Sequence, residues 1–407
     1  MACCHACING WAERLAVFFD WWWTMKLTIP DYIKAIEPYV PGKPLEALER
    51  EYGISDSVKL ASNENPLGPS PKALAAIRNG LSALHRYPDG AGHLLTHKIA
   101  DANGILPANV VIGNGSDDII ALMVRALIRP GDRVIVPRPS FLMYAIAAST
   151  AGAVVESVPL KALAMDLDAM AERVTADTRL VFVCNPNNPT GTVVTQKAFD
   201  RFMARLPDDV VVVVDEAYIE FARNSNCLKT GQPSDLNRPL VTLRTFSKVY
   251  GLAGLRVGYG IMPASLAELL NRVRPPFNVN SMAQAAAAAA LDDRSFLQQT
   301  VALIHQGLGD LYEALDRLGL TYFKTEANFF LIDVGQPADV VFEHMLRQGV
   351  IVRSMRAYGF PTYIRVNVGL DSENRRFLRA LETVLSLKDH PKRIRPGNAK
   401  WSINRCC

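Results

Sequence analysis

The sequence has 407 residues, of which 49% are hydrophobic and 21% charged, and its formal net charge is +4. This length allows a large core and more than one domain. The small net charge, with no dense stripe of Lys and Arg, argues against nucleic-acid binding. No apolar run approaches the roughly 18 residues needed to cross a bilayer, so we expect a soluble, globular protein without membrane or nucleic-acid partners.

The cysteines are concentrated at the two ends of the chain. Five of the seven lie at the extreme termini, and only Cys184 and Cys227 lie in the body, which is typical of a reduced, cytoplasmic protein rather than a disulfide framework. Cys4 and Cys7 have a C-x2-C spacing, but structural zinc normally has four ordered ligands. We therefore expect no metal site. Residues 1–24 are predicted to be a disordered extension, and residues 389–407 a polar, basic tail.

The body alternates short apolar runs with helical patterns. "NVVIGNGSDD" is a strand that enters a glycine turn, "DIIALMVRALI" has helical spacing, and "RVIVP" is a second strand. "TRLVFVCNP" and "DVVVVVDEAY" are continuous, valine-rich runs of strand length, which suit strands buried on both faces. We predict an α/β fold with a mostly parallel central sheet and helices on both faces.

The second half of the chain continues this pattern and then changes. "LVTLRTFSK" and "LRVGYGIM" resemble two more strands, and the alanines at 285–290 follow Asn280 and Ser281, good helix-capping residues. After residue 300, a long helix and the strands "ANFFLIDV" and "YIRVNVGL" indicate a smaller α+β unit. The predicted division is an N-terminal arm at 25–60, a large domain at 61–290 and a small C-terminal domain at 291–388.

Several polar residues follow predicted strands, where ligands bind in open α/β sheets. Asp215 closes the valine run, but it suits a turn carboxylate as well as a ligand contact. The turn at 115–117 places backbone N–H groups at a helix start, yet Ser116 also suits a plain N-cap. Asn188 lies in a polar turn, and Lys248 alone would be an ordinary solvated lysine.

Taken together, these residues predict a cofactor. Lys248 lies between a Ser and a lean, glycine-containing turn, with Arg256 eight positions further on. A lysine amine forms a Schiff base with an aldehyde, a buried carboxylate such as Asp215 keeps a pyridine nitrogen protonated, and an arginine holds a phosphate. The combination fits pyridoxal 5'-phosphate.

At this point the sequence resembles the fold-type I pyridoxal-phosphate aminotransferases of class I and II, most closely the histidinol-phosphate aminotransferases. The resemblance covers nearly the whole body, from about residue 29 to residue 387. The motifs that carry it, in chain order, are "YVPGKPLEALEREYG", "KLASNENPLGPSP", "RYPDG", "GNGSDD", "CNPNNPTG", "DEAYIEF", "TFSKVYGLAGLRVGYG" and "YIRVNVG".

The resemblance implies a role for each matching residue. Lys248 would carry the cofactor and act as acid and base, and Asp215 would pair with its ring nitrogen. The remaining cofactor contacts would be Asn188 and Tyr218 at the ring oxygen, Tyr144 stacked on the ring, and Gly115, Ser116, Asp117, Thr245, Ser247 and Arg256 around the phosphate. Tyr87 would reach that phosphate from the other subunit of a homodimer.

The resemblance also implies the substrate contacts. Arg365 would bind the substrate's anionic group, and Arg353, Tyr39 and Asn188 would add further contacts, although Arg353 also suits a surface ion pair and Tyr39 an aromatic that packs the arm. The implied reaction is transamination between histidinol phosphate and 2-oxoglutarate in histidine biosynthesis. An aromatic amino-acid aminotransferase, a phosphothreonine-type decarboxylase and a non-catalytic pyridoxal-phosphate-binding protein remain as alternatives.

Overall fold

The computed structural model describes residues 27–39 and 41–386. The predicted extension at 1–24, with Cys4 and Cys7, lies outside the described residues, as does the predicted tail at 389–407. Residues 27–38 belong to a first unit, in which the short helix α2 (Asp31–Lys34) has no buried residue. The second unit begins at Tyr39 and contains the other described helices and strands.

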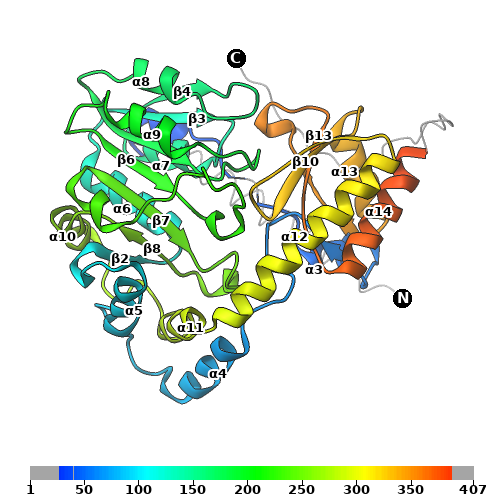
Figure 1. The fold of residues 1–407 in the computed structure, drawn as a ribbon, viewed down its shortest axis with the longest axis horizontal. Coiled ribbons are helices and arrows are strands. Elements are labelled where there is room, and N and C mark those ends of the chain that lie inside the picture. Colours follow the sequence, from blue (N-terminus) through cyan, green and yellow to red (C-terminus); the bar gives the residue numbers. More distant parts are fainter. Residues whose placement is uncertain (1–26, 40, 387–407) are drawn as a thin grey trace, which may run out of the picture. The chain divides into compact units, whose positions relative to one another are not determined.

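A seven-stranded sheet forms the centre of the large domain (Figure 1), in the strand order β2-β8-β7-β6-β5-β3-β4. From β7 to β4 all neighbouring strands are parallel, whereas β8 is antiparallel to both β7 and β2. The predicted mostly parallel sheet is therefore confirmed. The strands are β2 (Val110–Gly113), β3 (Arg133–Arg138), β4 (Val154–Pro159), β5 (Thr178–Cys184), β6 (Val211–Asp215), β7 (Leu240–Thr245) and β8 (Gly258–Ile261).

Strand β6 shows why this sheet is buried on both faces. Val213 packs into one hydrophobic cluster with α6, α7 and α10, whereas Val212 and Val214 pack into another cluster with α8 and α9. Successive side chains of a strand point to opposite faces, so an uninterrupted valine run places apolar side chains on both faces of the sheet. These helices are α6 (Ser116–Leu127), α7 (Met143–Thr150), α8 (Leu167–Glu172), α9 (Gln196–Met203) and α10 (Ala264–Val273).

A third cluster covers the β2–β8 end of the sheet. Helix α11 (Ser281–Leu291) contributes five buried alanines to the core and packs against α4 (Pro71–Gly80) and α5 (His93–Asn103). The side chain of Asn280 accepts a hydrogen bond from the backbone N–H of Ala283, so the predicted capped alanine helix is confirmed. Its small side chains let neighbouring helices approach closely.

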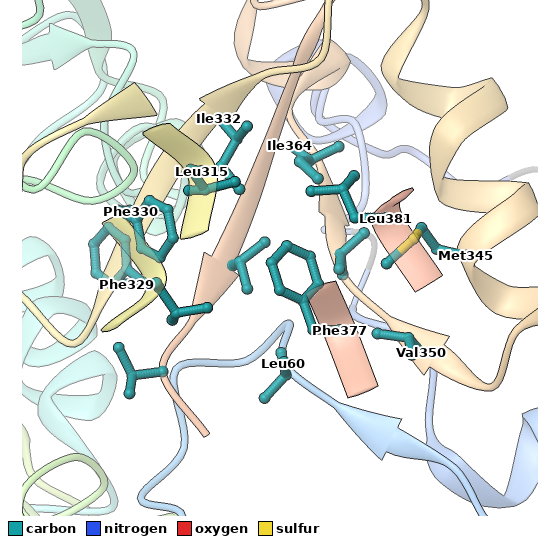
Figure 2. Close-up of a cluster of buried hydrophobic side chains, with 14 of the residues drawn as sticks. Leu60, Leu315, Phe329, Phe330, Ile332, Met345, Val350, Ile364, Phe377 and Leu381 are labelled. Atoms are coloured by element: carbon teal, nitrogen blue, oxygen red, sulfur yellow. The ribbon is translucent and has the colours of Figure 1, made fainter. Parts of the chain in front are cut away.

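The small domain combines α12 (Arg294–Arg317), α13 (Ala338–Arg347) and α14 (Asp371–Ser386) with a four-stranded antiparallel sheet in the order β12-β13-β10-β9. Figure 2 shows its core, in which Phe329 and Phe330 of β10 lie in one cluster with Phe377 and Leu381 of α14. The strands are β9 (Thr321–Phe323), β10 (Phe329–Asp333), β12 (Arg353–Ser354) and β13 (Tyr363–Asn367).

The segment that precedes the large domain joins the small one. Strand β1 (Val58–Lys59) pairs in parallel with β11 (Val350–Ile351), and Leu48 of α3 (Leu45–Tyr52) packs with Ile351. The domain limits drawn from the sequence stay predictions. The remaining short elements are the 3-10 helices η1 (Leu81–Ala83), η2 (Pro107–Asn109), η3 (Ile219–Phe221), η4 (Pro233–Asn237), η5 (Ala253–Leu255) and η6 (Arg356–Tyr358).

Neither a membrane-spanning helix nor a metal-binding cluster is found within residues 27–39 and 41–386. None of the helices there is both long and apolar enough to cross a membrane. Within the same ranges, no group of three or more His, Cys, Asp or Glu side chains is arranged to hold a metal ion.

Candidate active site

The candidate site lies where β5, β6 and β7 end. Register pairs Cys184 of β5 with Asp215 of β6, and Asp215 with Leu243 of β7, so the carboxyl ends of these parallel strands share one edge of the sheet. A single pocket there collects most of the predicted residues. Those that line it are Tyr39, Ser116, Asp117, Asn188, Asp215, Tyr218, Thr245, Ser247, Lys248, Arg256, Arg353 and Arg365.

Asp215 is a buried carboxylate at the end of β6. Its Oδ2 accepts a hydrogen bond from the Tyr144 hydroxyl at 2.7 Å, and its Oδ1 accepts one from the backbone N–H of Ala217 at 3.2 Å. Burial raises the pKa of Asp215 to about 6, although the bond from Tyr144 opposes this shift. Near neutral pH, the pocket therefore presents a desolvated negative charge suited to a cationic ligand atom.

Tyr144 lies beside the pocket rather than in its lining. Its side chain is fully buried, it stacks on Phe182 with ring centroids 4.6 Å apart, and it is absent from the pocket lining. Phe141 does line the pocket, and it packs edge-on against Tyr144 with ring centroids 5.5 Å apart. Tyr144 thus supports Asp215 from outside the pocket lining, and the stacking role assigned to it from the sequence stays a prediction.

Lys248 follows β7 in a tight loop. Its Nζ donates a hydrogen bond to the Ser62 carbonyl at 3.1 Å and lies 5.6 Å from the centre of the Tyr218 ring. Burial, and then the charge of Arg365, lower the pKa of Lys248 to about 8. A substantial fraction of this amine is therefore neutral, and nucleophilic, close to physiological pH.

The lean turn after Lys248 has a steric reason. Gly251 has φ of +70°, a left-handed conformation, and a Cβ at this position would collide with the backbone carbonyl of Gly68. The turn also uses the hydroxyl of Thr245, which accepts a hydrogen bond from the backbone N–H of Ser247 at 3.1 Å. The close approach of the Gly68 carbonyl thus leaves no room for a side chain at position 251 of the loop that presents the lysine.

Opposite Asp215, the pocket is suited to an anion. The N-terminus of α6 faces Arg256, and Gly115 is the N-cap with φ of +88° and no side-chain cap. A Cβ on Gly115 would lie 2.6 Å from Arg256 Nη2 and would displace the end of that side chain, and the left-handed φ itself favours glycine. Ser116 is the first helical residue rather than the N-cap, which rules out the capping alternative for it. Asp117 Oδ2 lies 3.5 Å from Arg256 Nη2.

The substrate side of the pocket contains two arginines on neighbouring strands. Arg353 of β12 and Arg365 of β13 are register partners, so their side chains leave the same face of the small sheet. Arg365 is buried, donates to Asn188 Oδ1 and to the Ala61 carbonyl at 2.8 Å, and has no hydrogen-bond partner at Nε within the described chain. Two guanidinium groups this close favour an anionic ligand.

Tyr87 lies away from this pocket on its own chain. Its side chain is 82% exposed, stacks on Phe277 with ring centroids 4.8 Å apart, and does not line the pocket. Gly115 also does not line it, but its contact with Arg256 places it directly behind the anion side. The roles assigned to these residues from the sequence stay predictions.

The family described as "Aminotransferase class I and II" matches residues 55–381. Histidinol-phosphate aminotransferase 2 of Carboxydothermus hydrogenoformans is 48% identical over 356 residues, which cover 87% of this chain and 98% of that protein. The chain belongs to the class I and II aminotransferases. The histidinol-phosphate aminotransferase of Desulfotalea psychrophila is 47% identical, with 89% of this chain and 96% of that protein covered.

Structure comparison leads to the same family. The crystal structure of histidinol-phosphate aminotransferase from Sinorhizobium meliloti, in complex with pyridoxal 5'-phosphate, matches with a TM-score of 0.82 and 28% identity. The match covers 89% of this aminotransferase and 99% of that chain. The fold class and the family predicted from the sequence are both confirmed.

Eight of the residues that line the pocket of this aminotransferase had no assignment from the sequence, and three of them have larger side chains that bear on the site. Asn63 and Tyr358 line the pocket beside the arginines, and Phe141 lines it beside Asp215. Phe141 lies only three residues before Tyr144, so the second aromatic residue of this short stretch was the available signal for it. Asn63 lies inside a motif that carried the resemblance, but its left-handed backbone, with φ of +56°, is visible only in the structure.

Proposed function

We propose that this chain is a pyridoxal-5'-phosphate-dependent transaminase that exchanges the amino group between histidinol phosphate and 2-oxoglutarate, in histidine biosynthesis. The observation that carries the proposal is the pair of register-matched arginines, Arg353 and Arg365, in the same pocket as a buried carboxylate and a lysine of lowered pKa. The names of the relatives support the phosphorylated donor.

The residues present fit the cofactor. The hydroxyls of Thr245 and Ser247, the guanidinium of Arg256 and the free backbone N–H groups at the start of α6 form a donor set for a phosphate. Asp117 would serve through its backbone N–H, because its carboxylate faces Arg256 and would repel an anion. Asp215 would hold the ring nitrogen, and Asn188 and Tyr218 the ring oxygen.

Pyridoxal 5'-phosphate, when bound, supplies an aldehyde for the amino group and a ring that withdraws electrons from the substrate's Cα. Asp215 keeps a negative charge buried beside that ring, since its pKa of about 6 leaves it ionised at neutral pH. Lys248 Nζ takes the proton from the substrate's Cα and later returns one, because its lowered pKa leaves the amine able to do both near neutral pH.

Arg365 and Arg353 would bind the substrate's anion, and Tyr39, at the pocket mouth, would contact its imidazole ring. A phosphate monoester carries close to two negative charges near neutral pH, against one for a carboxylate. A second guanidinium therefore favours the phosphorylated donor. The aromatic-aminotransferase alternative is not favoured by these relatives, and the decarboxylase and non-catalytic alternatives gain no specific support from the pocket.

Substitution of Arg353 tests this choice of substrate. Arg353→Ala should reduce kcat/KM for histidinol phosphate by about ten- to a hundred-fold, the value of a charge-assisted contact, and reduce turnover of phenylalanine and tyrosine much less. The matched control is Arg356→Ala, three residues on, where the exposed guanidinium pairs with Asp339 at 2.9 Å. Equal losses for phosphorylated and carboxylate donors would contradict the proposal.

We also propose a cytoplasmic homodimer with shared active sites. Leu81, Leu84 and Tyr87 expose large apolar surfaces within seven residues, and Phe277, stacked on Tyr87, is itself 45% exposed. An apolar surface of this kind favours burial against a second copy. The unpaired thiols of Cys184 and Cys227 suit a reducing compartment.

Complementation between two inactive variants tests the shared site. Lys248→Ala and Tyr87→Ala chains should each be inactive or crippled as homodimers, and mixed dimers should regain one site that combines an intact lysine with the other chain's intact tyrosine. Subunit exchange should therefore restore part of the activity. Demonstrated mixed dimers without recovered activity would show that both residues serve a site on one chain.

A further inference from the structure

Asn63 is a buried residue in an unusual conformation beside the pocket. Only 2% of it is exposed, its φ is +56°, and it lines the pocket next to Tyr218. Non-glycine residues in the left-handed region are uncommon, and asparagine is among the few side chains that tolerate it. A polar residue held there at a binding site calls for a specific reason.

Two asparagines of the small domain fix the backbone of Asn63 from both sides. Its N–H donates to Asn367 Oδ1 at 3.1 Å, and its carbonyl accepts from Asn328 Nδ2 at 3.1 Å. Asn328 is fully buried and Asn367 nearly so, and both lie at the same end of the β10–β13 pair, where Phe329 is the register partner of Asn367. Because the backbone of Asn63 is held at both its N–H and its carbonyl, its carboxamide points in a fixed direction.

That carboxamide acts on Tyr218. Asn63 Nδ2 donates a hydrogen bond to the Tyr218 hydroxyl oxygen at 3.0 Å, and Asn63 Oδ1 is buried without a partner in the described chain. The reverse orientation would orphan the amide N–H groups instead, and orphaned buried donors are rarer than under-used carbonyl oxygens. A tyrosine hydroxyl has a single hydrogen, so an oxygen that accepts from Asn63 keeps that hydrogen for another acceptor.

We propose that Asn63 is a positioning residue that acts through Tyr218: it occupies the hydroxyl oxygen and turns the hydroxyl hydrogen into the pocket, toward the phenolic oxygen of the bound cofactor. The inference rests on the proposed cofactor site. The charged and titratable groups that face Tyr218 are Arg365, Cys184 and Asp215, with Lys248 Nζ over its ring. None of these supplies a hydrogen bond to the Tyr218 oxygen in the described chain.

The proposal predicts that loss of this hydrogen bond changes the pKa of the linkage between Lys248 and the cofactor. A hydrogen donated to the phenolic oxygen stabilises its negative charge, which is fullest when the lysine–cofactor linkage has lost its proton. Removal of the donor therefore raises the pKa of that linkage, which is measured directly from the pH dependence of the visible absorption of the holoenzyme. This readout does not depend on turnover.

A double-mutant cycle tests the inference. Tyr218→Phe should raise the linkage pKa by about 1 unit, and Asn63→Gly, which removes the carboxamide and suits the left-handed backbone, by about 0.5 unit. In the Tyr218→Phe background, Asn63→Gly should add less than about 0.2 unit, because it acts only through the hydroxyl. Asn109→Ala, which removes another buried asparagine far from Tyr218 in the fold, is the matched control and should leave the pKa unchanged.

A second variant keeps the inference testable if Asn63→Gly fails to fold. Asn63→Asp keeps the shape but removes the N–H donor, so the hydroxyl hydrogen turns toward the new carboxylate, and the pKa rise should exceed that of Asn63→Gly. The inference fails if either substitution leaves the pKa unchanged while Tyr218→Phe raises it, or if Asn63→Gly gives its full shift without the hydroxyl. If Tyr218→Phe itself has no effect, the proposed placement of the cofactor at Tyr218 is wrong, and the inference falls with it.

Discussion

The hydrogen bond from Tyr144 to Asp215 makes a prediction that can be quantified from the structure. Both partners are buried, and the bond is 2.7 Å long. A hydrogen bond to a charged group contributes about 1.5–3 kcal/mol, and one pKa unit corresponds to about 1.4 kcal/mol. Tyr144→Phe should therefore raise the pKa of Asp215 in the cofactor-free protein from about 6 to about 7–8.

The effect on ionisation at neutral pH is large. With a pKa of about 6, roughly nine-tenths of Asp215 is ionised at pH 7, whereas a pKa of about 7–8 leaves between roughly half and a tenth. Because the proposed role of Asp215 needs the ionised form, activity is lost as pH falls through its pKa. The acid limb of the pH–rate profile should therefore move to higher pH in Tyr144→Phe.

Two measurements and one control variant test the predicted effect of Tyr144→Phe. Carbon-13 NMR of labelled aspartate carboxyls gives the pKa of Asp215, with Asp215→Asn to assign the signal, and single-turnover rates at saturating amino donor give the pH profile. Tyr250→Phe is the matched control, since it removes a hydroxyl from a mostly buried tyrosine that makes no contact with Asp215. A pKa within about 0.3 unit of the parent's in Tyr144→Phe would refute the reasoning.

Three further predictions concern the same region. Lys248→Ala should abolish turnover without unfolding the protein, and borohydride should fix the cofactor to Lys248 in the parent protein; a label on another peptide would refute the assignment. Capture of pyridoxal 5'-phosphate by the cofactor-free protein should accelerate as pH rises through about 8, where the Lys248 amine loses its proton, and stopped-flow absorbance should show no such inflection if the pKa is the ordinary one near 10.5. Glu216→Gln should leave Arg244 without its buried counter-charge and lower the free energy of unfolding by about 3 kcal/mol in denaturant titrations, whereas Glu268→Gln, in the exposed pair with Arg272, should cost less than about 0.5 kcal/mol.

The sequence was most informative where local pattern decides the structure. A valine run such as that before Asp215 has few alternatives to a strand buried on both faces, and Asn280 before the alanines defines a helix start. Lys248 and Asp215 could be assigned together because both follow strands that end at one edge of a parallel sheet. The sequence assigned Arg353 and Arg365 only to the same substrate, and the register of β12 and β13 shows why the two side chains share a face.

The sequence was least informative where the outcome depends on side-chain direction. Tyr144 and Phe141 are both aromatic and lie three residues apart, and they differ in which side of the entry to α7 they face. One supports Asp215 from behind and the other lines the pocket. Asn63 depends on partners 265 and 304 residues away, Asn328 and Asn367, and no local signal contains that information.

The short stretch from Ala61 to Asn63 has a practical consequence for anyone who screens or redesigns this pocket. The carbonyl oxygens of Ala61 and Ser62 accept hydrogen bonds from Arg365 and Lys248. An alanine scan cannot alter Ala61 and leaves the Ser62 carbonyl in place, so neither contact with the two cations would be detected. Transplanting the lysine, aspartate and arginines onto another scaffold would likewise omit part of the pocket, because main-chain carbonyls form that part. Amide-to-ester substitution can probe these carbonyls, whereas side-chain exchange cannot.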